Sequence, residues 1–84
     1  MKIYTMKNCV ECTKLKEILK NLPLKYEFVD VEKIGFTGEC PRIVYDDVCN
    51  IPDIVGLSRI KKHLISEMVD VLGYDMGLVK KLVR

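Results

Sequence analysis

The sequence predicts an α/β fold in which a β-α-β unit is followed by a β-β-α unit and an additional C-terminal helix. Two observations predict it: short β-branched and aromatic segments alternate with hydrophobic residues at helical spacing, and turns with Gly or Pro separate them. The 84-residue chain has 49% hydrophobic and 31% charged residues, as in an ordinary globular protein. We therefore expect residues 1–84 to form a single domain, built on a mixed four-stranded sheet.

The first half of the chain predicts a strand, a helix and a second strand. Residues 3–6 are β-branched and aromatic, as in a strand. From Thr13 onward, apolar residues recur at the spacing of an amphipathic helix of about three turns. These residues are Leu15, Ile18, Leu19 and Leu22. Pro23 ends the helix, and residues 25–31 are expected to form a second strand parallel to the first.

The middle of the chain predicts a loop and a hairpin. Residues 32–40 contain two glycines and show no helical period, so we expect a loop. Residues 42–45 and 48–51 have strand character and are separated by two aspartates, which predicts an antiparallel hairpin with its turn at 46–47. Pro52 should weaken any further pairing and suits the edge of the sheet.

Two helices are expected at the C-terminal end. Ser58 is a plausible N-cap for the first, and Gly73 is expected to close it. Its apolar face should comprise Ile60, Leu64, Met68 and Leu72. A last helix over residues 75–83 should fold three apolar side chains back onto the body. These are Met76, Val79 and Leu82.

Charge and hydropathy exclude several functions. The 14 Lys and Arg against 12 Asp and Glu give a net charge of +2, too small to indicate nucleic acid as a partner, and no basic stripe is interleaved with aromatics. No apolar run suits a signal peptide or a membrane span, so we expect no membrane partner and a cytoplasmic location. Structural disulfides are rare in the cytoplasm. The four cysteines of this chain therefore call for a catalytic, redox or metal explanation.

The pair Cys9 and Cys12 forms a Cys-x-x-Cys motif between the first predicted strand and the first predicted helix. Unpaired N–H groups and the dipole of a helix N-terminus favour an anion there. Cys9 should therefore attack as the thiolate, and Cys12 should resolve the mixed disulfide. Glu11 would oppose the thiolate, whereas Lys7 and Lys14 would favour it. We expect a reducing couple that needs no cofactor.

Other interpretations of the cysteines remain open. Cys40 and Cys49 could complete a four-cysteine zinc or iron site with the motif, although the eight residues between them do not suit a zinc knuckle. Otherwise Cys40 is expected to be a small buried hydrophobe before a strand that starts at Pro41, and Cys49 plain core. The chain could also be a redox-inactive interaction domain that docks through its terminal helix. His63, the single histidine, is expected to be solvated and inert.

Residues 4–12, with Tyr-Thr, three residues and then Cys-Val-x-Cys, resemble the active-site segment of glutaredoxin-like redoxins, and most of all those that reduce ribonucleotide reductase. Residues 41–46 are similar to the family's Pro-x-Val-x-x-Asp hairpin, and residues 56–58 to its glycine before the last helix. The likeness covers about residues 1–70. It implies a minimal thioredoxin- or glutaredoxin-like fold, with the helix between the second and third strands shortened or lost.

The resemblance also implies roles for residues. Cys9 would be the nucleophile and Cys12 the resolving thiol, while Pro41 would be a cis-proline facing them. Cys40, through its backbone, and Gly56 would contact the substrate. That substrate would be a disulfide-bearing protein such as ribonucleotide reductase, and thioredoxin reductase or glutathione would supply electrons. Only one glycine of the family's usual pair is present, and the dithiol lacks the usual proline or tyrosine, which puts the use of glutathione in question.

Overall fold

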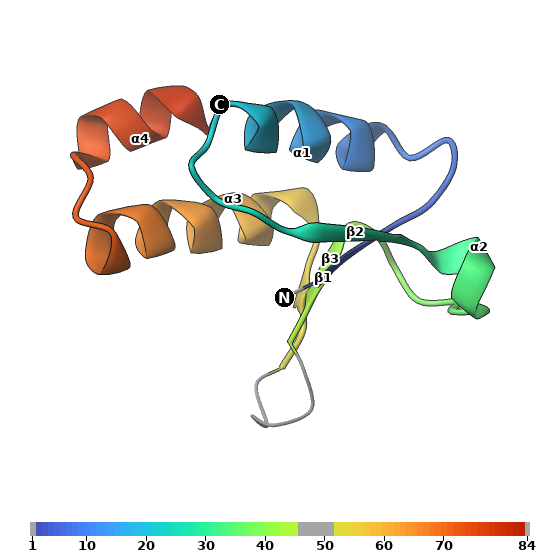
Figure 1. Cartoon of the computed structure of the whole chain (residues 1–84). Helices are drawn as coiled ribbons and strands as arrows, with labels where there is room; N and C mark the ends of the chain where they lie inside the picture. The colour runs from blue at the N-terminus through green and yellow to red at the C-terminus, as the bar shows by residue number, and fades with distance from the viewer. Residues whose placement is uncertain (1, 46–51, 84) are drawn as a thin grey trace.

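The computed structural model describes residues 2–45 and 52–83. Its strands and helices follow one another in the order shown in Figure 1. They are β1 (Lys2–Thr5), α1 (Val10–Lys20), β2 (Glu27–Asp30), α2 (Val31–Ile34), β3 (Arg42–Val44), β4 (Ile54–Val55), α3 (Leu57–Ser66), the π-helical turn η1 (Glu67–Val71) and α4 (Met76–Leu82). This is the predicted sequence of a β-α-β unit, a β-β-α unit and a further C-terminal helix.

The strands form one mixed sheet in the order β2-β1-β3-β4. β1 is parallel to β2 and antiparallel to β3, and β3 is antiparallel to β4. Ile3 of β1 lies between Phe28 of β2 and Ile43 of β3 in this register. The α/β fold with a mixed four-stranded sheet is thus confirmed, in the minimal thioredoxin-like form with an added C-terminal helix.

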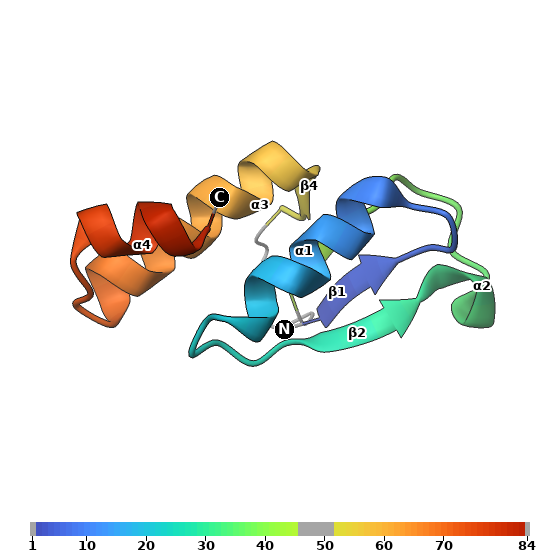
Figure 2. The ribbon, with the colours of Figure 1, turned by 90° about the horizontal axis from the view of Figure 1, so that it is seen from above.

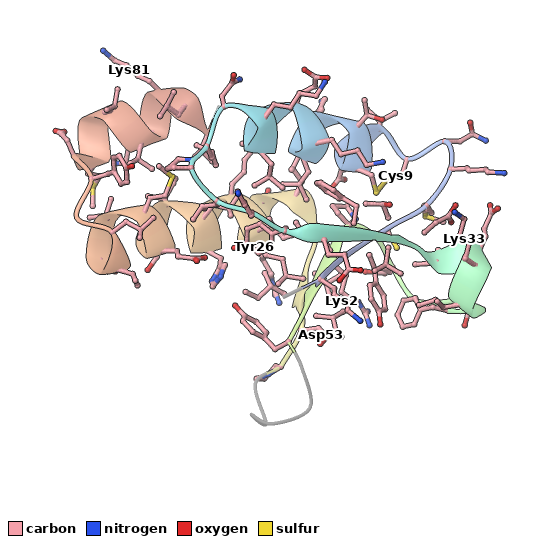
Figure 3. The ribbon with its side chains drawn as sticks, in the orientation of Figure 1. Lys2, Cys9, Tyr26, Lys33, Asp53 and Lys81 are labelled. Atoms are coloured by element: carbon pink, nitrogen blue, oxygen red, sulfur yellow. A yellow bond between two sulfur atoms is a disulfide. The ribbon has the colours of Figure 1, made fainter. Side chains whose placement is uncertain are left out.

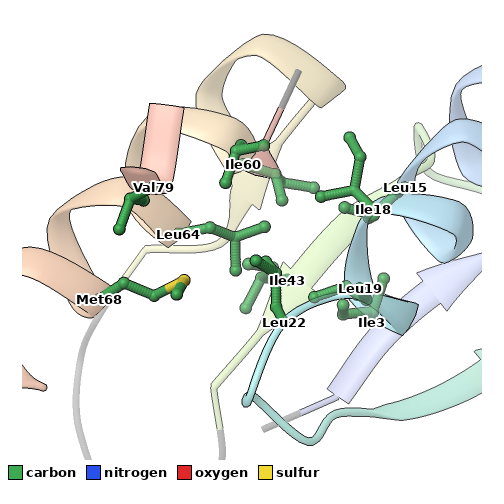
Figure 4. Packing of buried hydrophobic residues seen from close by; sticks show 11 residues of the cluster. Ile3, Leu15, Ile18, Leu19, Leu22, Ile43, Ile60, Leu64, Met68 and Val79 are labelled. Carbon is green, nitrogen blue, oxygen red and sulfur yellow. The ribbon is translucent and has the colours of Figure 1, made fainter. Parts of the chain in front are cut away.

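The helices α1 and α3 pack against the sheet, and α4 folds back beside α3 (Figures 1 and 2). The core between them holds one cluster of buried side chains from β1, β3 and all the longer helices (Figure 4). Its members are Ile3, Leu15, Ile18, Leu19, Leu22, Ile43, Ile60, Leu64, Met68, Val79 and Val83. The predicted apolar face of α1 is confirmed for Leu15, Ile18 and Leu19, which belong to this cluster; Leu22 belongs to it too, but lies beyond Lys20, the last residue of α1.

The fourth strand of the described sheet, β4, lies after the segment for which a strand was predicted. Residues 46–51, which include the expected turn and the expected strand 48–51, lie outside the described residues. β4 follows Pro52, with Ile54 opposite Ile43 and Val55 opposite Arg42. β4 is the edge strand of the sheet, as expected for the neighbourhood of Pro52, but the expected weakening of pairing after Pro52 was wrong: a proline before the first residue of a strand removes no hydrogen bond from it.

The segment expected to be a loop begins with a short helix, α2. The Asp30 carboxylate accepts a hydrogen bond of 3.0 Å from the N–H of Glu32, which caps the helix start. Gly35, in the left-handed conformation at φ 68°, ends it. The helix between the second and third strands is thus shortened and not lost. A single turn carries no hydrophobic period, so only its caps could have revealed it.

The predicted cap of α3 was also wrong. The helix starts at Leu57 after Gly56, and Ser58 lies inside its first turn. Ile60, Leu64 and Met68 are fully buried as expected. Leu72, however, is 46% exposed.

The reason lies in the helix geometry. The last turn, η1, is π-helical and wider than an α-helical turn, so it rotates the following residue away from the apolar face. Gly73 follows at φ 76°, as expected for the end of the helix.

The last helix forms close to where it was predicted. The side chain of Asp75 caps it by accepting a hydrogen bond of 3.1 Å from the N–H of Gly77. Val79 is fully buried and Leu82 is partly buried against the core. Met76 is 50% exposed, so its predicted packing was wrong, since it stands in the first turn at the far end of the helix.

Candidate active site

Cys9 is the N-cap residue of α1, four residues after the end of β1 (Figure 3). Its backbone is extended, and its Sγ accepts a hydrogen bond of 3.1 Å from the N–H of Cys12. Asn8, immediately before it, has φ 57°, a left-handed conformation that asparagine tolerates better than most residues. The sulfur of Cys9 therefore occupies the place where a helix N-terminus stabilises negative charge.

Cys9 and Cys12 are joined as a disulfide, with their Cα atoms 5.2 Å apart. The two sulfurs differ in accessibility, because Cys12 is only 2% exposed and Cys9 is partly exposed. A group approaching from solvent would therefore meet Cys9 first. The pair can be opened to a dithiol and closed again without moving either residue out of the first turn of α1.

The residues that the resemblance placed opposite the motif lie beside Cys9. The Cys40–Pro41 peptide bond is cis, as the resemblance implied. The carbonyl oxygen of Cys40 is 3.9 Å from the Sγ of Cys9. Pro41 is buried, and its carbonyl accepts a hydrogen bond of 3.0 Å from the N–H of Gly56. Cys40, Pro41 and Gly56 are thus brought together along one side of the disulfide.

An open groove of about 490 Å³ runs along this side. Its lining residues come from the loop after β1, from α1, from the loop before β3 and from the end of β4. They are Met6, Glu11, Thr37, Gly38, Glu39, Cys40, Val55 and Gly56. We call this hollow the active-site groove. Cys40, expected to be buried, is partly exposed in it. Desolvation raises the pKa of the Cys40 thiol, and the positive charge of Arg42 lowers it in part.

The three charged residues expected to tune the couple are placed differently. Glu11 lines the groove, and its Oε1 accepts a hydrogen bond of 3.1 Å from the N–H of Leu57, the first residue of α3. The ammonium of Lys7 lies 3.5 Å from a carboxylate oxygen of Glu32. Lys14 is exposed on α1 and lines a different hollow, beside Lys61 of α3. Of these three charged residues, only Glu11 lines the active-site groove.

A stack of side chains next to the groove was not foreseen. The ring of Phe36 meets Tyr4 edge to face at 5.0 Å, and the guanidinium of Arg42 lies 5.0 Å from its centre. Arg42 also pairs with Asp53 at 3.4 Å. A Cβ atom on Gly38 would clash with the Phe36 ring, so a larger residue at this position would require the ring to move. The side chains in these contacts come from separate segments of the chain, so no local sequence pattern could have predicted the contacts.

His63 is neither solvated nor without partners, so that expectation was wrong. Its Nε2 is 2.9 Å from the hydroxyl of Tyr45 and 3.4 Å from the carboxylate of Glu67. The hydroxyl of Tyr26 donates a hydrogen bond of 2.8 Å to the same carboxylate. We call these four side chains the Glu67 cluster. It joins the residue after β3 and the residue before β2 to α3 and η1, and its hollow is lined by different residues from the active-site groove.

Metal binding finds no support in the part of the chain that the structure describes. Within residues 2–45 and 52–83, no three His, Cys, Asp or Glu side chains are grouped so that they could hold a metal ion. Cys49, a member of the four-cysteine alternative, lies outside these residues.

The described helices are all too short or too polar to cross a membrane.

Comparison with known proteins identifies a family. Neither the curated proteins nor the solved structures give a match. A family model described as Glutaredoxin matches residues 1–53, a segment that contains the Cys9–Cys12 pair, the cis-proline and the first three strands. Because the match covers more than half of the sequence, the chain belongs to the glutaredoxin family.

Proposed function

We propose that this chain is a protein disulfide reductase that works as a single domain, with Cys9 as the nucleophile and Cys12 as the resolving thiol. Members of the glutaredoxin family are thiol oxidoreductases that act on disulfides with the help of a reductant, and the Cys9–Cys12 pair supplies the dithiol. One observation carries the proposal: the partly exposed sulfur of Cys9 stands at the N-terminus of α1 and accepts the N–H of Cys12.

The reaction begins with the reduced protein. The thiolate of Cys9 attacks one sulfur of a substrate disulfide, forms a Cys9–substrate disulfide and releases the other substrate sulfur as a thiolate, which takes up a proton. Cys12 then loses its proton and attacks the Sγ of Cys9. This step forms the Cys9–Cys12 disulfide and releases the second substrate thiol. The substrate has gained two electrons from the protein and two protons, one released by Cys12 and one taken from solvent in place of the proton that Cys9 had lost as the thiolate.

The geometry supports this order of attack. Cys12 is buried and would be reached by a substrate only with difficulty, whereas Cys9 is partly exposed, and its sulfur lies 3.9 Å from the carbonyl oxygen of Cys40, a residue that lines the groove. The helix N-terminus that stabilises the attacking thiolate also stabilises the Cys9 sulfur as a leaving group when the protein is reduced again.

Cys40, Pro41 and Gly56 are proposed to hold the substrate chain. The carbonyl oxygen of Cys40, next to the cis-proline, lies 3.9 Å from the sulfur of Cys9. An extended substrate segment could pair with this backbone as a further strand does. The raised pKa of the Cys40 thiol keeps it protonated at neutral pH, so it is a poorer nucleophile than a thiolate would be.

We further propose a specific substrate and two candidate electron donors. The likeness of residues 4–12 to redoxins that reduce ribonucleotide reductase makes that enzyme the first substrate to test. Reduction of the Cys9–Cys12 disulfide needs an electron donor. This donor is either two molecules of glutathione or the dithiol of a thioredoxin reductase that receives its electrons from NADPH. A cytoplasmic location would provide both.

The test uses three serine variants of the full chain. We expect Cys9→Ser to abolish reduction of insulin and of oxidised ribonucleotide reductase. Cys12→Ser should accumulate a mixed disulfide with the substrate at Cys9, seen by mass spectrometry. Cys40→Ser, the control within the same groove, should retain the cycle, because Cys40 is proposed to hold the substrate through its backbone and not through its thiol. Activity that survives Cys9→Ser, or a substrate trapped on Cys40 instead of Cys9, would refute the assignment.

A further inference from the structure

The active-site groove carries negative charge. Two acidic residues, Glu11 and Glu39, line it. Among the described residues that form its walls, none is a Lys, Arg or His. The nearby cations face other carboxylates, since Lys7 lies 3.5 Å from Glu32 and Arg42 lies 3.4 Å from Asp53. A substrate entering the groove would therefore meet two negative charges that are not already neutralised by a lining cation.

The N-terminus of α3 is already paired with one of these carboxylates, so it is not free to bind an anionic substrate group. An exposed helix N-terminus attracts anions through its free N–H groups. Here Gly56 has no side chain with which to cap α3, and the carboxylate of Glu11 accepts the N–H of Leu57 at 3.1 Å. An internal anion thus already occupies the position that an anionic substrate group would take at this end of the groove.

We infer that the active-site groove selects disulfides flanked by basic residues and discriminates against anionic ones, with Glu11 and Glu39 as the specificity-determining residues. This inference rests on the proposed disulfide reduction at Cys9. It assigns a substrate class: a protein segment with Lys or Arg beside its disulfide. Glutathione, which carries two carboxylates and one ammonium at neutral pH, belongs to the disfavoured class.

The experiment measures single turnovers, so that no reductant has to be identified. Pre-reduced protein is mixed with one of three disulfide peptides that differ only in two flanking residues, which are Lys, Ser or Glu. The Cys9–Cys12 disulfide formed is quantified after acid quenching. We expect the Lys peptide to react about tenfold faster than the Glu peptide at low ionic strength. The ratio should fall toward one in 0.5 M salt, where charges are screened beyond about 3–5 Å.

Variants then assign the effect to the two carboxylates. Glu11→Gln removes the charge and keeps an oxygen that can accept the Leu57 N–H, and Glu39→Gln changes a loop residue on the other side of the groove. Each should lower the Lys-to-Glu rate ratio, and the double variant should bring it close to one. The matched control is Glu17→Gln, also on α1, whose carboxylate pairs with Lys20 outside the groove and whose loss should leave the ratio unchanged.

The outcomes separate the two proposals. A ratio near one in the wild-type chain, or a ratio that survives in the double variant, overturns the charge selection while disulfide reduction stands. If none of the three peptides is reduced, including the uncharged Ser peptide, the proposed function fails, and the charge selection fails with it. Should Glu11→Gln lose its fold, Glu39→Gln alone must still lower the ratio for the inference to hold.

Discussion

The Oε1 atom of Glu11 accepts a hydrogen bond of 3.1 Å from the backbone N–H of Leu57, 46 residues further along the chain. The contact connects the first turn of α1, which contains the disulfide, to the first residue of α3. The four N–H groups at a helix start have no partners within the helix. Glu11 therefore caps one helix from within another, and it fixes the distance between the Cys9–Cys12 pair and Gly56.

We predict that Glu11→Ala lowers the free energy of unfolding by about 1 kcal/mol, the typical loss when a helix cap is removed. Glu11→Gln should lose less than half of that amount, because its amide oxygen can still accept the Leu57 N–H. Urea unfolding of the oxidised protein measures both. Glu17→Ala is the control, since the exposed Glu17–Lys20 pair should contribute less than about 0.5 kcal/mol. Equal losses for the two alanine variants would contradict the capping role.

A second prediction concerns Cys40. Burial raises the pKa of its thiol, with Arg42 opposing the shift in part. Because only the thiolate reacts with iodoacetamide, the pH midpoint for alkylation of Cys40 in the folded protein should lie above that of an unfolded cysteine. The variant Cys9→Ser/Cys12→Ser/Cys49→Ser leaves Cys40 as the single cysteine for this measurement.

Two comparisons control the Cys40 experiment. The same triple variant in denaturant should return the midpoint to about 8.5. Adding Arg42→Gln should move the folded midpoint further up, because the nearby positive charge is lost. A folded midpoint at or below the denatured one would show that Cys40 is an activated thiol, and its proposed passive role at the groove would then be wrong.

What the sequence could reveal was local. The apolar period of α1 and the passage from strand to helix at Cys9 are short-range patterns, and both predicted their places correctly. The contacts that failed to appear in the prediction join distant segments, such as Glu11 with Leu57 or His63 with Tyr45. A side chain that looks solvated on its own helix carries no local sign of the partner that another element brings to it.

The positions of the shortest strand and helix were also not predicted. β4 has two residues, and its position is determined by pairing with β3, not by its own composition. α2 has four residues and owes its existence to the caps at its two ends. Hydrophobic periodicity needs several turns or several alternations to be seen, so it cannot locate elements of this length.

The wide turn η1 gives a third prediction, since Met68 and Leu72 were expected on the same apolar face. Met68 is fully buried, whereas Leu72 is 46% exposed. Met68→Ala should therefore lower the free energy of unfolding by about 2–5 kcal/mol. Leu72→Ala should lower it by less than about 1 kcal/mol, because little apolar surface is withdrawn from water there. Similar losses for the two variants, measured by urea unfolding, would mean that the helix continues as a regular α-helix.

The Glu67 cluster predicts how stability depends on pH. Burial, the hydrogen bond to Glu67 and its negative charge all raise the pKa of the Tyr26 phenol, and burial followed by the charge of Glu67 raises that of Tyr45. Below about pH 10, the ordinary value for tyrosine, both phenols are protonated in the folded and the unfolded chain, and their stabilising contribution is fully present. Above it the unfolded chain releases these protons first, so the folded state loses stability as pH rises.

Tyr26→Phe separates this effect from the titration of lysines in the same range. The variant should lose about 1 kcal/mol at neutral pH with its hydrogen bond to Glu67. Its free energy of unfolding should then fall less steeply than that of the wild type above about pH 10. Tyr74→Phe, on an exposed side chain outside the cluster, is the matched control. Urea unfolding at a series of pH values compares the three chains, and parallel curves for wild type and Tyr26→Phe would show that Tyr26 ionises as easily in the folded chain as in the unfolded one.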